Sequence, residues 1–213
     1  MDNAVAIVQA YLRLNGYFTV TEIPIVEAMR GGGHRTATDI DVLAFRFPGA
    51  GRLIPRAGGN PSRDRLVGSP DPALGMSQDE ADMLIGEVKE GRAELNRGAR
   101  DPAVLRAVLT RFGCCGPDAA EDLVQALIRT GRGRTHQGHQ IRLVAFGTSV
   151  EGPASGYHRV RLADVLNFTA TFLRENWDVL RVAEFKDPAL GFLATVIKSG
   201  AQMDNSSSGS LSR

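Results

Sequence analysis

The chain has 213 residues, of which 43% are hydrophobic and 23% charged, and its formal net charge is +1. These values are typical of a globular domain, and so small a net charge produces no global field that demands a nucleic acid partner. No apolar run approaches the about 18–20 residues that a membrane-spanning helix needs, so we expect no contact with a membrane. The first residues lack the basic start of a signal peptide. The adjacent Cys114 and Cys115 suggest neither a disulfide framework nor a zinc site, so a cytoplasmic location is expected.

Hydrophobic spacing and capping residues predict ten elements in the order α-β-β-β-α-α-β-β-α-α. Helices are expected over 3–15 and 163–181, and after the N-caps Asp101, Asp118 and Asp187. Strands are expected over 17–28, 36–47, 81–91, 141–147 and 158–162. Gly31–Gly33 predicts a turn between the first two strands, with a phosphate-binding loop as the alternative.

This order predicts an α/β fold in which a mixed central sheet is flanked by helices. The stretch 48–80 is rich in Pro and Gly and predicts a loop insertion between two strands. The polar, Ser-rich tail 203–213 is expected to be disordered. A single domain over 1–202 is therefore expected.

Two short acidic patterns lie in these apolar strands. Asp39 and Asp41 alternate in the second strand, and Glu87 and Lys89 alternate in the third. Side chains two apart in a strand share a face, so pairing of the two strands would bring a carboxylate from each to a common cation. Mg²⁺ fits this arrangement because it is bound by one or two carboxylates and keeps waters and room for a phosphate.

Lys89 suits a catalytic role better than an arginine would. The chain has three Lys among its 25 basic residues, and the other 22 are Arg. An ammonium near a cation can lose its proton and handle an attacking water, whereas a guanidinium stays charged. The alternative is a solvated strand face with cross-strand ion pairs. Because charges in apolar strands are costly unless they are paired or bound to metal, the composition favours a site.

The segments TDIDVLAF (38–45) and LIGEVKEG (84–91) resemble the PD-(D/E)XK nuclease superfamily, which has the restriction-endonuclease-like fold. The resemblance spans about residues 3–147 and implies an αβββαβ core, here followed by extra C-terminal helices. It implies that Asp41 and Glu87 bind Mg²⁺ or Mn²⁺, that Lys89 is catalytic and that Asp39 supports the site. The implied activity is an endonuclease that hydrolyses phosphodiester bonds of DNA through a metal-activated water and leaves a 5′ phosphate.

The chain departs from this family pattern in three ways. No proline precedes Asp41, and the insertion 48–80 lengthens the distance to Glu87. Many members carry a glutamate in the first helix, where this chain has only Gln9, and Glu22 or Glu27 are the acidic alternatives. Two other functions therefore stay open: a nuclease-fold module that binds nucleic acid or protein without cleavage, and an interaction domain in which the acids form an ion-pair network.

Basic residues gather in two segments. No acidic residue occurs between Leu123 and Val150, and this stretch holds Arg132, Arg134 and Arg142, while the insertion holds Arg52 and Arg56. Such loops beside a carboxylate site are expected to bind a phosphate backbone, with a solvated hairpin as the alternative. DNA or RNA specificity and the oligomeric state, a homodimer included, stay open.

Overall fold

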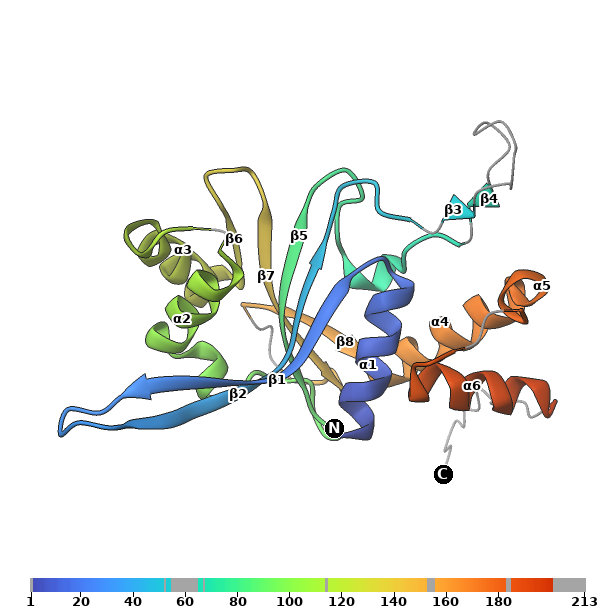
Figure 1. Cartoon of the computed structure of the whole chain (residues 1–213), viewed down its shortest axis with the longest axis horizontal. Coiled ribbons are helices and arrows are strands. Elements are labelled where there is room, and N and C mark those ends of the chain that lie inside the picture. Colours follow the sequence, from blue (N-terminus) through green and yellow to red (C-terminus); the bar gives the residue numbers. More distant parts are fainter. Residues whose placement is uncertain are drawn as a thin grey trace, which may run out of the picture.

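The computed structural model describes residues 2–51, 53–54, 65–66, 68–113, 115–152, 156–182 and 185–200. Its centre is a mixed six-stranded sheet with helices on both faces, so the expected α/β class is confirmed (Figure 1). The sheet is formed by β1 (Phe18–Ala28), β2 (His34–Arg46), β5 (Asp82–Val88), β6 (Arg132–Arg134), β7 (Gln140–Gly147) and β8 (His158–Arg161). Its order is β1-β2-β5-β7-β6, and β8 also pairs with β7.

Strand directions in the sheet are mixed. β2 pairs antiparallel with β1 on one side and with β5 on the other, whereas β5 and β7 pair parallel. β6 returns antiparallel to β7, and β8 runs parallel to it. β5 and β7 are the most buried strands, as their near-continuous apolar sequences lead one to expect.

The helices form two layers. α2 (Pro102–Phe112) and α3 (Pro117–Thr130) pack on one face, in a cluster that includes Ile40, Ile85 and Leu143. α1 (Asn3–Leu14) and α4 (Leu162–Glu175) pack on the other face. α6 (Pro188–Lys198) lies outside them and packs on both. None of the helices in the described ranges is long and apolar enough to cross a membrane.

The boundaries correct several sequence expectations. α3 begins at Pro117 after the N-cap Gly116, not at Asp118. The helix expected over 163–181 divides into α4 and α5 (Trp177–Leu180), because Asn176 leaves the helical conformation and its Nδ2 donates to the carbonyl of Phe172 at 2.8 Å.

The insertion also contains short regular elements. The described part of 48–80 holds the two-residue strands β3 (Leu53–Ile54) and β4 (Arg65–Leu66) and the 3-10 helix η2 (Pro72–Leu74). The tail 203–213 lies outside the described residues.

β1 and β2 form a hairpin that extends well beyond the sheet and runs beside α2 (Figure 1). Gly31–Gly33 form its turn, as expected, and lead into a strand. Where the hairpin leaves the sheet, Glu22 has a φ of 52°, which non-glycine residues seldom adopt. The side chains of β2 change faces of the sheet at the same level. Ile40 packs in the cluster beneath α2, whereas Val42, two residues later, packs in the cluster beneath α1. Regular alternation is therefore interrupted at Asp41.

Candidate functional site

Asp41 and Glu87 lie at facing positions of neighbouring strands. β2 and β5 pair from Arg46↔Asp82 to Val42↔Gly86, and the same register one residue further places Asp41 opposite Glu87. The strands separate at that point, and Asp41 Oδ2 accepts the backbone N–H of Val88 at 2.7 Å. The Asp41 side chain thus takes the place of a ladder hydrogen bond at the end of the pair.

Glu87 is a buried carboxylate with unequal oxygens. Its side chain is 1% exposed, and its Oε1 accepts hydrogen bonds from Lys89 Nζ and from Asn96 Nδ2, the latter at 2.7 Å. Its Oε2 is buried and has no hydrogen-bond partner among the described residues. The Lys89 side chain is 38% exposed, so one side of its ammonium faces Glu87 while the other can reach solvent.

The electrostatics of the site disfavour two bare carboxylates. Burial raises the pKa of Glu87, and the nearby Asp41 raises it further, although the hydrogen bond from Lys89 opposes both effects. Burial likewise raises the pKa of Asp41, against the opposing effects of the Val88 N–H and the Lys89 charge. A cation between the two carboxylates would remove this cost, since an opposite charge favours their ionised forms.

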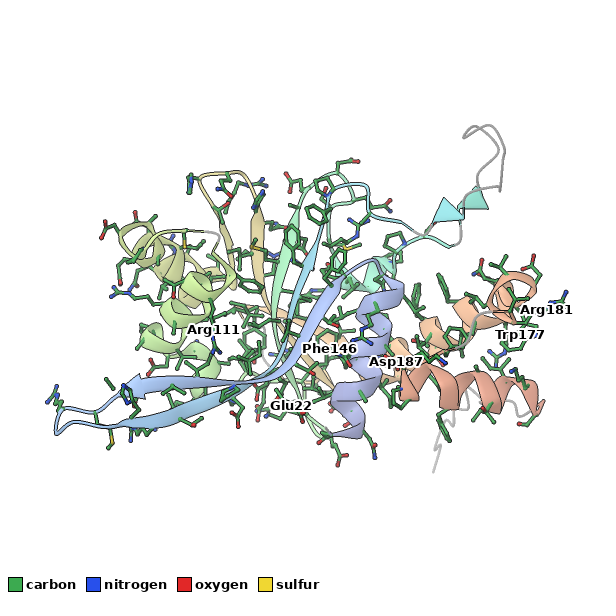
Figure 2. All side chains as sticks on the ribbon, in the orientation of Figure 1. Glu22, Arg111, Phe146, Trp177, Arg181 and Asp187 are labelled. Carbon is green, nitrogen blue, oxygen red and sulfur yellow. The ribbon has the colours of Figure 1, made fainter. Side chains whose placement is uncertain are left out.

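Glu22 lies level with these carboxylates on the third neighbouring strand. The β1–β2 register pairs Thr21 with Val42 and Ile23 with Ile40, which places Glu22 opposite Asp41. Figure 2 labels Glu22 at this junction. The backbone N–H of Asp2, just before α1, donates to Glu22 Oε1 at 3.4 Å.

The other residues considered for the missing acidic position lie elsewhere. Gln9 is buried within α1, and Glu27 pairs with Arg35 further along the hairpin. Asp39, the expected supporting acid, is exposed and lies opposite Pro24, on the hairpin side of Asp41. Of the three alternatives, Glu22 is the one that the strand register places beside Asp41.

The donor set fits a hard divalent cation. Within the described ranges, no group of three or more His, Cys, Asp or Glu side chains is arranged to hold a metal ion. Mg²⁺, however, is commonly held by one or two carboxylates and retains several waters. Asp41 and Glu87 supply two carboxylates, and the buried Glu87 Oε2 is an acceptor without a donor. An unsatisfied buried oxygen of this kind is costly unless a cation or a water completes it.

Arg134 lies at the far end of the sheet from this site, whereas Arg132 pairs with Arg142, which is level with Leu84 on β5, three positions before Glu87. β6 pairs Arg134 with Gln140, and Gln140 is level with Asp82 on β5, five positions before Glu87. Five strand residues span about 17 Å. Arg134 is also held by both oxygens of Glu80, at 2.9 and 3.0 Å. The structure therefore does not bring these arginines to the carboxylates.

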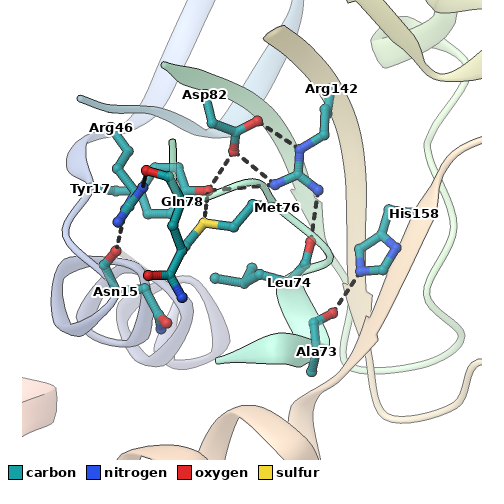
Figure 3. Close-up of polar contacts among 10 residues, drawn as sticks. All are labelled: Asn15, Tyr17, Arg46, Ala73, Leu74, Met76, Gln78, Asp82, Arg142 and His158. Atoms are coloured by element: carbon teal, nitrogen blue, oxygen red, sulfur yellow. Dashed lines mark hydrogen bonds and ion pairs between the residues drawn. The ribbon is translucent and has the colours of Figure 1, made fainter. Parts of the chain in front are cut away.

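Arg142 corrects a sequence expectation, because it cannot contact a phosphate from where it lies. Its side chain is 0% exposed and donates to both oxygens of Asp82 at 2.8 Å and to the carbonyl of Leu74 at 2.7 Å (Figure 3). Its position inside the apolar run IRLVAFG was the sequence signal for burial. Arg52 and Arg56 lie outside the described residues.

Sequence reasoning missed the segment that follows β5. Asn96 contacts Glu87 from the loop before the 3-10 helix η3 (Gly98–Arg100), and no spacing in the sequence links the two residues. Arg97 and Arg100 of this segment are exposed. Arg97 follows Asn96 directly, ten positions after Glu87, and Arg100 ends η3.

Fold and site together define a mixed α/β protein with a buried carboxylate, Glu87, a half-buried carboxylate, Asp41, and the adjoining Lys89. Comparison of the chain with models of protein families, with curated proteins and with solved structures finds no match. Similarity therefore assigns neither a family nor an activity, and the function has to be argued from the site.

Proposed function

We propose that the protein is a metal-dependent nuclease that hydrolyses phosphodiester bonds of DNA. The observation that carries the proposal is the convergence of Asp41, Glu87 and Lys89 at the point where β2 and β5 separate. Carboxylates and a lysine arranged around one point are suited to phosphoryl chemistry, because they can hold a cation and stabilise charge that develops at the phosphate.

The order of elements supports the resemblance to PD-(D/E)XK nucleases. If the short strands β3 and β4 count as part of the insertion, the helices and strands of the described chain run α1-β1-β2-β5-α2-α3-β6-β7 up to residue 147, apart from the 3-10 helices. This order agrees with the αβββαβ core that the resemblance implies, with one extra helix and the short strand β6 before the last strand. The acidic strand and the Glu-x-Lys strand are its second and third strands, and they are neighbours.

In this proposal Asp41 and Glu87 hold the cation and Lys89 acts on the attacking water. A bound Mg²⁺ or Mn²⁺ would supply a water of lowered pKa and neutralise charge at phosphorus. Glu87 anchors Lys89 through Oε1, and the exposed part of the ammonium is free to hold the water or to stabilise developing negative charge. Val88 fixes the orientation of Asp41 through its backbone N–H.

The test is a cleavage assay with duplex, single-stranded and branched DNA in the presence of Mg²⁺ or Mn²⁺. We expect cleavage that EDTA abolishes, and a rate about 10²–10⁴-fold lower for Lys89→Ala. Lys198→Ala is the matched control, because Lys198 packs over Trp177 on α5, away from the strands of the site. Equal rates for Lys89→Ala and wild type would refute the proposed site.

A module that binds nucleic acid without cleaving it is the second candidate. It is favoured by the finding that, in the part of the chain the structure describes, fewer than three potential ligands converge on any one point. DNA binding by the wild type without cleavage in any metal, on any of the three substrates, would support this second function.

A further inference from the structure

Asn96 is the neutral donor to the buried Glu87 carboxylate. It lies nine positions after Glu87, and its Nδ2 donates to Glu87 Oε1 at 2.7 Å. Its other amide atom is also engaged, since Oδ1 accepts the backbone N–H of Ala99 at 2.6 Å. The amide orientation is thereby fixed at both ends, because a flipped amide would face the Ala99 N–H with its own NH₂ group.

The loop that carries Asn96 is itself anchored to the sheet. The backbone N–H of Ala93 donates to the carbonyl of Ser149 at 2.7 Å. Gly147 of β7 also packs closely against Ala93, since a Cβ added to Gly147 would lie 2.4 Å from the backbone nitrogen of Ala93. On the other side, Gly98 packs on Thr38 of β2, where an added Cβ would lie 2.7 Å away. These contacts on both sides of Asn96 fix the position of its loop relative to Glu87.

We propose that Asn96 is a positioning residue that holds Glu87 Oε1, so that Oε2 is presented to a divalent cation. The inference rests on the proposed function. Two donors reach Oε1 and none of the described residues reaches Oε2, so the carboxylate has one satisfied and one available oxygen. When Lys89 turns toward substrate, Asn96 remains as the donor to Oε1. A neutral amide does this without placing a further positive charge beside the cation.

The test variant is Asn96→Ser. A serine hydroxyl at this position can still accept the Ala99 N–H, as Ser and Asn do in equivalent turns, but it is too short to reach Glu87. A merely structural role of Asn96 is therefore kept, while the contact with the carboxylate is lost. Asn167→Ser on α4, which packs on the opposite face of the sheet, is the matched control for the substitution itself.

The readout is Mn²⁺ binding by calorimetry without DNA, together with the thermal midpoint of each variant. We expect Asn96→Ser to bind Mn²⁺ about 10–100-fold more weakly than wild type, as loss of a residue that orients a metal ligand usually does. Its midpoint should match that of Asn167→Ser, and Asp41→Asn serves as the reference for a lost ligand.

The outcomes distinguish failure of the inference about Asn96 from failure of the proposed function. Mn²⁺ binding by wild type and equally by Asn96→Ser would overturn the inference and leave the proposed function standing. No Mn²⁺ binding by wild type would overturn the proposed function and the inference with it. Weaker Mn²⁺ binding by Asn96→Ser, together with a thermal midpoint clearly below that of Asn167→Ser, would show that Asn96 acts only through the stability of the turn. That result would also contradict the proposal.

Discussion

Lys89 has the two properties that a residue acting on an attacking water needs. Its ammonium is fixed by a buried carboxylate, and 38% of its side chain is exposed where a substrate can approach. An arginine in the same place could make the ion pair with Glu87, but its guanidinium would not give up a proton. A role of Lys89 in moving a proton, as proposed above, is therefore testable apart from its charge.

Lys89→Arg is expected to remain as defective as Lys89→Ala in cleavage, within about tenfold. Arginine keeps the positive charge, so an electrostatic role alone would be largely restored, whereas proton handling would not. Single-turnover cleavage rates at saturating Mg²⁺ measure the difference. Near wild-type rates for the arginine variant would show that the residue only clamps charge.

At the scale of single elements, β7 carries a buried ion pair at one end and borders the candidate site at the other. Arg142 on β7 is level with Leu84 on β5, and its side chain pairs with Asp82, two residues earlier on β5; both side chains are almost fully buried. Tyr17 also donates its hydroxyl to Asp82, and burial together with that carboxylate raises the pKa of Tyr17 far above its usual range. This cluster joins the start of β1, the start of β5 and β7.

Arg142→Met is expected to destabilise the protein by about 3–5 kcal/mol, because Asp82 would be left as an unpaired buried charge. Urea unfolding followed by circular dichroism measures the loss. Arg142→Met/Asp82→Leu should recover a large part of the stability, since an apolar pair replaces the ion pair. A single variant as stable as wild type would mean that Asp82 finds another partner or is protonated.

The β6 hairpin remains a candidate for contacts with nucleic acid far from the carboxylates. Arg132 and Arg134 are exposed on it, although Glu80 already holds Arg134. A duplex that reaches both Arg134 and the site would have to lie along the strands for about 17 Å, or about five base pairs at 3.4 Å each, and one that reaches Arg132 for about 10 Å.

Arg132→Ala and Arg134→Ala are each expected to weaken DNA binding to a similar extent for all sequences. Each lost phosphate contact should reduce the slope of log K against log salt by about 0.9 for duplex DNA and about 0.7 for single strands. Fluorescence anisotropy at several salt concentrations gives the slope, and Arg174→Ala on α4 is the control. Slopes equal to that of wild type would make the hairpin a solvated surface.

At the scale of the whole molecule, His158 links the segment around η2 to β8 and through it to the sheet. Its Nε2 lies 2.7 Å from the carbonyl oxygen of Ala73 (Figure 3). Gly75 packs against its ring. Burial lowers the pKa of His158, although the hydrogen bond to Ala73 opposes the effect. The folded protein therefore prefers the neutral ring.

The free energy of unfolding should consequently fall as the pH is lowered below the ordinary histidine value of about 6.5. In the interval between that value and the lowered pKa of the folded state, the unfolded chain binds a proton that the folded chain does not. The stabilising contribution is full above the ordinary pKa and is lost as the pH falls through the interval.

Asp41 and Glu87 act in the opposite sense, since their raised pKa values favour the folded state at low pH. The measurement is therefore the difference in urea midpoint between wild type and His158→Gln at about pH 7.5 and about pH 5.5. We expect wild type to lose more stability than the variant over this interval. Parallel losses would contradict a buried neutral His158.

The sequence by itself determined the apolar strands, most helix caps and the patterns at Asp41 and Glu87-x-Lys89. These depend on neighbours along the chain: hydrophobic period, capping residues and the alternation of side chains in a strand. Only the tertiary structure decided the rest, because it depends on segments far apart in sequence. The burial of Arg142 comes from Asp82, 60 positions away, and the role of Asn96 comes from a loop that folds back on β5. The position of Glu22 opposite Asp41 likewise follows from the register of β1 and β2. A shift of that register by one residue would have placed a different residue opposite Asp41.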